Sequence, residues 1–393
     1  MKLLHVMVSL NPIFGGQPEV VKQLVESLSE LGHQSEIVTL DDFAYQFPEK
    51  NQTTIYSLAP SYGKYHLNFK LVEWLAHNAK NFDCVICHGI WQFQSYGTWL
   101  ASRIGHFPFF VYVHGALDPW FKYTYPLKHL KKWFYWPWAE YFVLKNATGV
   151  LFTSEGEKNQ AAKSFELYKV NGMVVNIGIK APVVDPTHVK QVFLKAFPEL
   201  EGKQSLLFMG RIHPIKGCDY LIRVFSEFAL LNQKLHLVMA GPDVIGWKTE
   251  LINLANKLKI ADRITWTGML ENEEKWGALT NADCVVLPSH TENFGMVVAE
   301  ALACRTPVLI SNKVNIWKDI ANEQAGFVAD DTVEGLRDSF QKWSSLDQLG
   351  KKDMKENAYR CFAQHFEIKA NSRKLINEIQ TEIFKCQKTL KKR

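Results

Sequence analysis

The stretch "DCVVLPSHTENFGMVVAEALACRTPVLIS" (residues 283–311) decides the fold class of this chain. It opens with a short apolar run, passes through a polar loop, continues as a longer apolar segment and ends in a second short apolar run. Short apolar runs between turn residues are typical of buried strands, and a helix is the usual connection between two parallel strands. The stretch therefore predicts one strand–helix–strand unit of a parallel sheet.

The same alternation fills most of the 393 residues. It begins at "KLLHVMVS" (2–9) and restarts at "QSLLFMG" (204–210), after a proline-containing segment, 179–203, that lacks a clear strand and is interpreted as a linker. We predict an α/β fold with two doubly wound, Rossmann-like domains facing across a cleft. Residues 1–180 form the first domain in this interpretation, 181–360 form the second, and 361–393 form a helical segment that packs back toward the first.

The composition excludes several classes of protein. The net charge is +5, from 45 basic and 40 acidic residues, which is too mild to indicate nucleic-acid binding. The seven cysteines lie mostly in apolar stretches and suggest no disulfide framework, so we expect a reducing, cytoplasmic location. Cys84 and Cys87 have no second pair for zinc and are interpreted as structural. The first residues, "KLLHVMVS", have no long apolar region and no small-residue cleavage site, so we expect no signal peptide. No apolar run approaches about 18 residues, so we expect no membrane-spanning segment.

Two loops after predicted strands carry the residues of an anion site. Arg211 and Lys216 lie in "GRIHPIKG" (210–217), where two cations can neutralise a diphosphate without a metal ion. Gly15 and Gly16 precede a helix, which lets backbone N–H groups approach an anion. The alternatives are solvated loop cations and an ordinary tight turn. Because the chain has no Asp-x-Asp, G-x-G-x-x-G or Walker motif, we expect no metal ion and no nicotinamide or flavin cofactor.

Two carboxylates in the opening stretch complete the pattern. Glu292 lies in the polar loop, where it can accept hydrogen bonds from sugar hydroxyls, and Glu300 lies within the following helix, from which it can reach a ribose. The alternative for Glu300 is a solvated helix face, although its neighbours are almost all apolar. A ligand with a sugar, a diphosphate and a nucleoside would use both carboxylates and the two cations.

This combination resembles the retaining glycosyltransferases of family 4, which have the GT-B architecture. Their Glu-x7-Glu motif matches Glu292 and Glu300, their Gly-Arg…Lys-Gly motif matches residues 210–217, and "VHGALDPW" (113–120) is similar to the segment with their active-site histidine. The resemblance implies roles by position: Gly15 and Gly16 at the diphosphate; Arg211 and Lys216 at the leaving phosphate; Glu292 with Phe294, Gly295 and Met296 at the transferred sugar; Glu300 at the ribose; Gly268, Met269 and Leu270 at the base; and His114 in the active site.

Two positions depart from the family pattern. Arg305 stands where such sequences usually carry glycine after the helix, and a left-handed backbone there would cost about 1 kcal/mol for arginine. "VVNIGI" (174–179) replaces the usual Pro-Asn-Gly near the crossing between the domains. Neither position carries a proposed catalytic group.

The resemblance implies a metal-independent, retaining transfer of a sugar from a UDP- or GDP-linked donor to an acceptor hydroxyl. The acceptor is expected to be a glycan or a lipid-linked molecule of bacterial surface polysaccharide or glycolipid synthesis. Two alternatives stay open: a non-catalytic module that binds nucleotide sugars, and a nucleotide-sugar epimerase of the same architecture.

Residues 119–147, "PWFKYTYPLKHLKKWFYWPWAEYFVLKNA", predict a further property. They contain four of the twelve tryptophans with lysines interleaved, a composition that suits the headgroup region of an anionic membrane. We therefore expect peripheral contact with the inner face of a membrane. The alternative is that these aromatic residues pack a helix onto the first domain.

Overall fold

The computed structural model of the chain describes residues 1–14, 16–47 and 53–390, and its contacts divide the chain into two compact units. Unit 1 contains Met1–Gly178 and the C-terminal segment from Ile368, and unit 2 contains Ile179–Glu367. The chain thus leaves unit 1 after Gly178 and returns at Ile368, whereas the sequence pattern predicts these boundaries after residues 180 and 360. Among the described residues, no helix combines the length and the apolar composition that a membrane-spanning segment needs.

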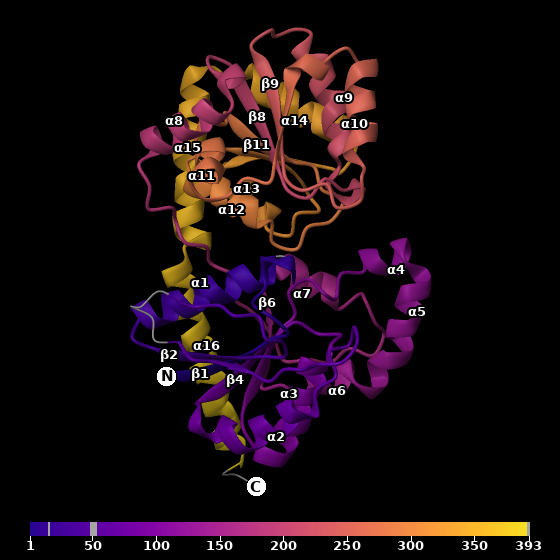
Figure 1. Ribbon diagram of the computed structural model, residues 1–393, viewed down its shortest axis with the longest axis vertical. Helices are drawn as coiled ribbons and strands as arrows, with labels where there is room; N and C mark the ends of the chain where they lie inside the picture. The colour runs from indigo at the N-terminus through magenta and orange to yellow at the C-terminus, as the bar shows by residue number, and fades with distance from the viewer. Residues whose placement is uncertain (15, 48–52, 391–393) are drawn as a thin grey trace. The chain divides into compact units, whose positions relative to one another are not determined.

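Unit 1 is built on a seven-stranded parallel sheet in the order β3-β2-β1-β4-β5-β6-β7 (Figure 1). The strand order reverses direction between β1 and β4, so this is the switch point of the doubly wound sheet. Its elements are β1 (Lys2–Val6), α1 (Gly16–Glu30), β2 (Gln34–Thr39), β3 (Ile55–Ser57), α2 (Phe69–Asn78), β4 (Cys84–His88), α3 (Phe93–Gly105), β5 (Phe109–Tyr112), α4 (Trp120–Thr124), α5 (Pro126–Tyr135), α6 (Glu140–Asn146), β6 (Gly149–Phe152), α7 (Glu155–Ala161), β7 (Gly172–Val174) and α16 (Ile368–Leu390).

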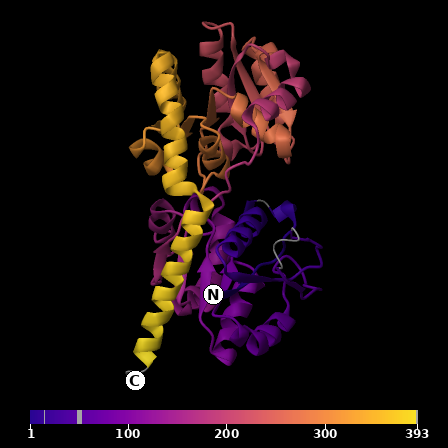
Figure 2. The same cartoon turned by 90° about the vertical axis from the view of Figure 1, so that its left-hand side faces the viewer.

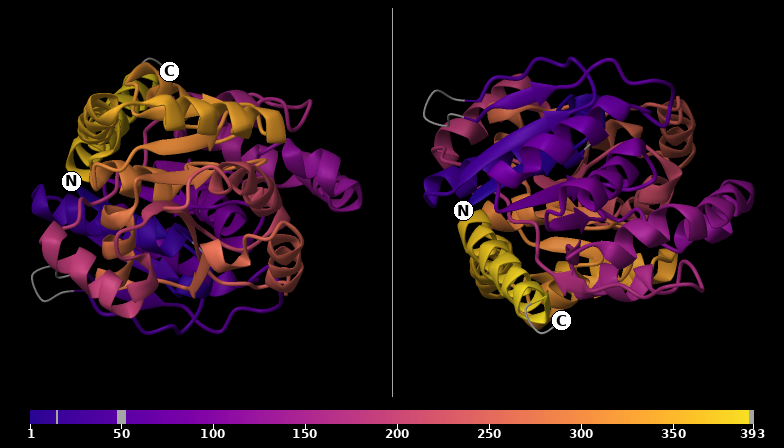
Figure 3. Two further views of the ribbon diagram at one scale, coloured as in Figure 1. Left: turned by 90° about the horizontal axis from the view of Figure 1, so that it is seen from above. Right: turned by 90° about the horizontal axis from the view of Figure 1, so that it is seen from below.

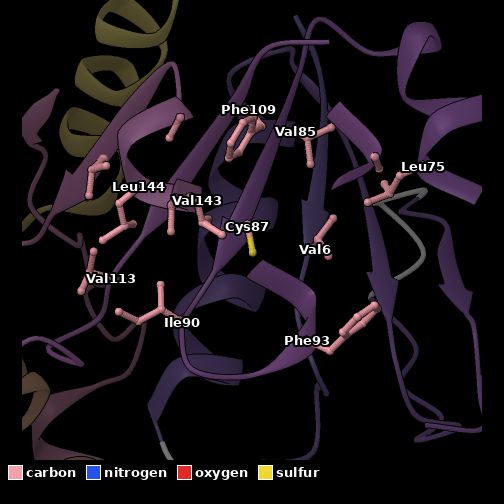
Figure 4. Packing of buried hydrophobic residues seen from close by; sticks show 14 of the residues in the cluster. Val6, Leu75, Val85, Cys87, Ile90, Phe93, Phe109, Val113, Val143 and Leu144 are labelled. Atoms are coloured by element: carbon pink, nitrogen blue, oxygen red, sulfur yellow. The ribbon is translucent and has the colours of Figure 1, made fainter. Parts of the chain in front are cut away.

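The core of unit 1 lies on both faces of this sheet, because β4, β5 and β6 are buried at every position and β1 is buried from Leu3 to Val6. Figure 4 shows one face, where Val85, Cys87 and Phe109 of β4 and β5 meet Phe93 and the α6 residue Leu144. Each fully buried Leu or Phe contributes about 1.5–3 kcal/mol relative to an exposed one. The side chains of Cys84 and Cys87 belong to clusters on opposite faces and both thiols are free, which agrees with a structural role for this pair.

The C-terminal helix α16 covers the other face of unit 1 (Figure 2). Leu375, Ile376 and Ile379 are buried there against Leu3 and Leu24 of β1 and α1. The helix starts beside Gly178, where a Cβ atom would lie 2.2 Å from Ile368 Cα. The glycine of the atypical "VVNIGI" segment is therefore required by a close backbone approach.

Unit 2 contains a six-stranded parallel sheet in the order β10-β9-β8-β11-β12-β13, with its switch point between β8 and β11 (Figure 1). The two parallel, doubly wound sheets confirm the predicted α/β class. Its elements are α8 (Pro186–Ala196), β8 (Gln204–Met209), α9 (Cys218–Ala229), β9 (Leu235–Ala240), α10 (Lys248–Lys257), β10 (Ile264–Gly268), α11 (Asn272–Asn281), β11 (Cys284–Leu287), α12 (Met296–Ala303), β12 (Val308–Ser311), α13 (Trp317–Asn322), β13 (Gly326–Ala329), α14 (Val333–Ser345) and α15 (Gln348–Cys361), followed by a π-helical turn, η7 (Phe362–Phe366).

Residues 179–203, which the sequence suggested as a linker, belong to unit 2 and contain α8. Asp185 caps the helix by accepting from the Thr187 N–H at 3.0 Å, and Pro186 occupies its first turn. The helix packs closely on α11, where a Cβ atom on Gly277 would lie 2.2 Å from the Val189 carbonyl oxygen.

Arg305 has the left-handed backbone that the sequence analysis considered, with φ of 58°. Its guanidinium lies 4.4 Å from the Tyr359 ring centroid and pairs with Glu356, both on α15. These two contacts offset the strain of about 1 kcal/mol that the conformation costs a non-glycine residue.

Candidate active site

Four of the predicted functional groups lie in two loops at the switch point of unit 2. Arg211 and Lys216 follow β8, and Glu292 and Gly295 follow β11, the strand paired with β8. Ligands of doubly wound sheets bind at the carboxyl ends of the strands at this point. The topology alone therefore places these residues where a ligand is expected.

The two loops are tied together by three contacts. The His290 N–H donates to the Ile215 carbonyl at 2.8 Å, and the Lys216 ammonium donates to Glu292 Oε2. Gly217 is left-handed at φ 67°, and a Cβ atom there would lie 2.4 Å from the Pro288 carbonyl oxygen. Only glycine allows the Lys216 loop to pack this closely against the end of β11.

The charged groups in these loops differ in their partners. Lys216 and Glu292 form a half-buried ion pair, with side chains 12% and 21% exposed. Arg211 is exposed and makes no ion pair within the described parts of the chain. An incoming diphosphate would therefore meet one unpaired cation and one cation whose partner carboxylate it must replace.

The backbone of Glu292 is held on both sides. Its N–H donates to the Lys313 carbonyl, and its carbonyl accepts from the Asn315 N–H, both at 3.0 Å. These bonds extend the loop as a parallel bridge to the segment after β12. Glu292 follows β11, its backbone is bonded to the segment after β12, and its carboxylate pairs with Lys216 after β8. These contacts fix the position of the carboxylate, as a sugar-binding group requires.

Glu300 lies within α12 and is buried, with only 5% of its surface exposed. Its Oε1 accepts from the Lys275 ammonium of α11 at 2.6 Å. A solvated helix face is therefore not its environment. The ion pair with Lys275 compensates for the burial of this carboxylate, whose oxygens can accept hydrogen bonds from the two hydroxyls of a ribose.

The start of α12 has the features of an anion site. Gly295 is left-handed at φ 72° and precedes the helix, so the first turn can present the N–H groups of Met296 and Val297, whereas that of Val298 donates to the Gly295 carbonyl at 2.8 Å. The Phe294 side chain is buried against Phe366, with ring centroids 5.7 Å apart. Because this side chain is buried, only the backbone of Phe294 is available to a ligand.

Three glycines form the carboxyl ends of neighbouring strands on the other side of the switch point. The Gly210 N–H donates to Ala240 and the Gly241 N–H donates to Gly268, while a Cβ atom on Gly241 would lie 1.9 Å from the Gly210 oxygen. Beyond Gly268, Met269 is 63% exposed and Leu270 is buried. Met269 is therefore available to a base, whereas the Leu270 side chain belongs to the core.

The remaining candidates belong to unit 1. Gly16 is the first residue of α1, directly after the loop that follows β1 at the switch point of this sheet. Gly15 lies outside the described residues. His114 follows β5 with a left-handed backbone at φ 52°, and its neighbour Gly115 donates its N–H to Glu157 Oε1 at 2.5 Å.

Sequence reasoning missed three partners of these candidates. Ser154 caps α7 by accepting from the Glu157 N–H, and the Glu157 carboxylate accepts from the Thr153 and Gly115 N–H groups. Lys275 pairs with Glu300, and His88 bonds to His114 across two strands. The contacts of Glu157 with Gly115, of Lys275 with Glu300 and of His88 with His114 have no local sequence signal, because each joins separate elements of the fold.

Two known protein families match the chain. The family described as "Glycosyl transferase 4-like domain" matches residues 15–176, and that described as "Glycosyl transferases group 1" matches residues 190–360. The first match falls in unit 1 and the second in unit 2. Together they cover all the candidate residues and every strand of the two sheets except β1.

Individual relatives agree with these matches. A D-inositol 3-phosphate glycosyltransferase of Rhodococcus jostii is 30% identical over 182 residues, which are 44% of this chain and 40% of that protein. The chain therefore spans less than half the length of this curated relative. An uncharacterized glycosyltransferase of Methanocaldococcus jannaschii is 24% identical over 80% of the chain and 81% of its own length. The Anabaena protein HepE, solved with UDP and glucose, shares the fold, with a TM-score of 0.75, 16% identity and coverage of 97% and 100%.

Proposed function

Because the chain belongs to the family 4 glycosyltransferases with the GT-B architecture, we propose that it transfers a sugar from a nucleoside diphosphate to an acceptor hydroxyl. The observation that carries this proposal is the pairing of Lys216 with Glu292 at the switch point of unit 2, beside the unpaired Arg211. A binding module would need to hold the nucleotide, but it would not need two cations at the bond that breaks. The solved complexes of HepE with UDP and UDP-glucose support a uridine donor.

The charges explain how the reaction is assisted. The bond between the sugar carbon and the diphosphate oxygen breaks, and negative charge develops on that oxygen. Arg211 and Lys216 stabilise this charge, and preorganised groups of this kind are usually the largest catalytic contribution. When the diphosphate binds, it replaces Glu292 as the partner of the Lys216 ammonium. The Glu292 carboxylate can then accept hydrogen bonds from the sugar hydroxyls.

We further propose that the anomeric configuration is retained. The acceptor oxygen bonds to the sugar carbon on the face that the diphosphate leaves, and the acceptor proton passes to the departing phosphate oxygen. This path needs no protein base.

A panel of UDP- and GDP-sugars, incubated with the purified protein, tests the proposed transfer against its alternatives. A transferase releases nucleoside diphosphate in proportion to added glycan or lipid-linked acceptor. An epimerase converts the donor without any acceptor, and a binding module releases nothing. Saturable donor binding without turnover across the panel and across acceptors would overturn the proposal.

Metal independence is a separate prediction, because two cations perform the neutralisation that a metal ion would otherwise provide. We expect activity to be unchanged after treatment with excess chelator. Loss of activity on chelation and its recovery with Mg²⁺ or Mn²⁺ would show that a metal ion, rather than Arg211 and Lys216 alone, holds the diphosphate.

We propose that the acceptor is reached at an anionic membrane surface, through α4 and α5. Helix α5 has no buried residue, and the two helices project from the body of unit 1 (Figure 3). Leu127, Leu130 and Phe134, spaced three and four residues apart, line one face of α5 and are 79%, 51% and 62% exposed. Lys128 and Lys131 flank this face and are exposed. Apolar residues flanked by lysines suit the lipid interface.

Not every residue predicted for this contact faces outward. Trp133 and Trp138 are 49% and 77% exposed, but Trp136 is buried in the core. The Lys132 ammonium lies 4.6 Å from the Trp91 ring centroid, inside the unit. The alternative of inward packing is therefore correct for Trp136 and Lys132, and also for Tyr141, Val143 and Leu144 of α6, which are buried in the same core cluster.

The membrane proposal predicts that the protein cosediments at low salt with vesicles of equal parts phosphatidylcholine and phosphatidylglycerol. We expect Lys122→Glu/Lys128→Glu/Lys131→Glu and Leu127→Ser/Phe134→Ser each to weaken binding strongly, because they remove the charge and the apolar contribution. Leu230→Ser/Leu231→Ser removes exposed leucines from unit 2 and serves as the matched control. Equal binding by the charge-reversed variant would contradict the proposal.

A further inference from the structure

Three histidines form a continuous row across the sheet of unit 1. His5 Nδ1 lies 2.9 Å from His88 Nε2, and His88 Nδ1 lies 3.1 Å from His114 Nε2. The rings are stacked, with centroids 5.2 and 5.4 Å apart. His5 and His88 are completely buried, while His114 is half-buried at the open end of the row.

The register of the strands builds this row. His5 is paired with Ile86 on β4, and His88 lies two residues beyond Ile86. His88 is paired with Tyr112 on β5, and His114 lies two residues beyond Tyr112. Side chains two residues apart on a strand share a face of the sheet. Each histidine of the row therefore lies on the same face as the one before it, on the next strand and two residues further along. The row thus begins with His5 and His88 on β1 and β4, the two strands at the switch point, and ends with His114 in the loop after β5.

All three rings are neutral near pH 7. Burial lowers the pKa of His5 and of His114 to about 4, and burial with its two histidine neighbours holds the pKa of His88 well below its usual range. A neutral imidazole has one N–H donor and one acceptor. Since His88 uses both nitrogens within the row, the three tautomers are coupled and only two arrangements satisfy both bonds.

The two arrangements differ at the ends of the row. If His5 Nδ1 donates to His88 and His88 Nδ1 donates to His114, His114 must carry its proton on Nδ1. The opposite direction puts a proton on His5 Nε2, which is buried and has no hydrogen-bond partner within the described residues. Buried N–H groups without an acceptor are rarer than unused acceptors, so the first direction is favoured.

We propose that His5 and His88 are positioning residues that hold His114 in its Nδ1–H tautomer, so that His114 acts as a hydrogen-bond donor to a substrate hydroxyl or phosphate. The backbone of the same loop is fixed independently, by the bond from Gly115 N–H to the buried Glu157. Ring stacking with Tyr112, at 5.0 Å between centroids, fixes the plane of the His114 ring. The catalytic part of this proposal rests on the proposed function, whereas the tautomer is a property of the protein alone.

Nitrogen-15 NMR of histidine-labelled protein at pH 7 measures the tautomer directly. We expect His114 to be protonated on Nδ1, and to lose this preference in His88→Leu, which removes the donor. His88→Asn keeps an amide N–H close to the position of Nδ1 and is expected to restore it. His236→Gln replaces a buried histidine of unit 2 and is the control. An Nε2–H tautomer of His114, or an unchanged tautomer in His88→Leu, overturns the inference.

Measurements of kcat distinguish a positioning role of His88 from a purely structural one. We expect His88→Leu to lower kcat about tenfold, the loss of one oriented hydrogen bond, with His114→Ala giving a similar loss and the double variant no further loss. His88→Asn is expected to recover most of the activity, which a purely structural role would not predict. Wild-type kcat in His88→Leu contradicts the inference. If no donor is turned over by any form, the proposed function fails, while the tautomer measurement still decides the arrangement of the row.

Discussion

Turnover is expected to fall by a factor of about 30 to 1,000 in Lys216→Ala and in Arg211→Ala, which corresponds to a loss of about 2–4 kcal/mol of transition-state stabilisation. Both side chains lie at the carboxyl end of β8, where negative charge develops on the departing diphosphate. The loss should appear in kcat as well as in kcat/KM, because the charge is greatest in the transition state.

The controls separate this effect from unfolding. Lys216→Arg keeps the charge and is expected to retain more activity than Lys216→Ala. Arg337→Ala removes a surface arginine that pairs with Glu227 in the same unit, and it should leave turnover unchanged. Melting temperatures of all the variants are compared with the wild type. Near-wild-type turnover in a well-folded Lys216→Ala protein would contradict the proposed role of Lys216 in stabilising the diphosphate.

Glu300→Ala is expected to lower kcat/KM for the donor by a factor of about 10 to 150, since hydrogen bonds to a charged group contribute about 1.5–3 kcal/mol. The ribose is bound in the same way before and during the reaction, so most of the loss should appear as a higher KM. Initial rates over a range of donor concentrations measure the two constants separately.

Lys275 complicates this test, because Glu300→Ala leaves its ammonium without the carboxylate. The double variant Glu300→Ala/Lys275→Ala therefore accompanies the single one and should not recover donor affinity. Glu227→Ala breaks an exposed pair on the same unit and is the matched control. An unchanged KM for the donor in both Glu300 variants would rule out a ribose-binding role.

The sequence predicted the elements well where their apolar pattern was continuous. The strand, loop and helix around Glu292 and Glu300 are placed as expected, because Gly295 ends the loop and a long apolar run follows. Helix α8 was missed because its prolines suggested a linker, although Asp185 and Pro186 are a helix-start signal. Short strands such as β3 and β7 have only three residues each and leave little pattern to detect.

The candidate residues were predictable, but their partners were not. Lys275 precedes Glu300 by 25 residues, and His88 precedes His114 by 26, so both contacts depend on how separate elements pack. The carboxylate of Glu292 was expected to be free for a sugar, yet it is paired with Lys216 across 76 residues. Spacing in a sequence identifies which groups follow a strand, whereas strand order decides which of them meet.

The most direct test of the account follows one reaction by proton and phosphorus NMR, with a purified donor and an acceptor on which it is active. We predict that each new glycosidic bond is accompanied by release of one nucleoside diphosphate, and that the anomeric proton of the first product has the configuration of the donor. A product of inverted configuration, or release of nucleotide without a new glycosidic bond, would contradict it.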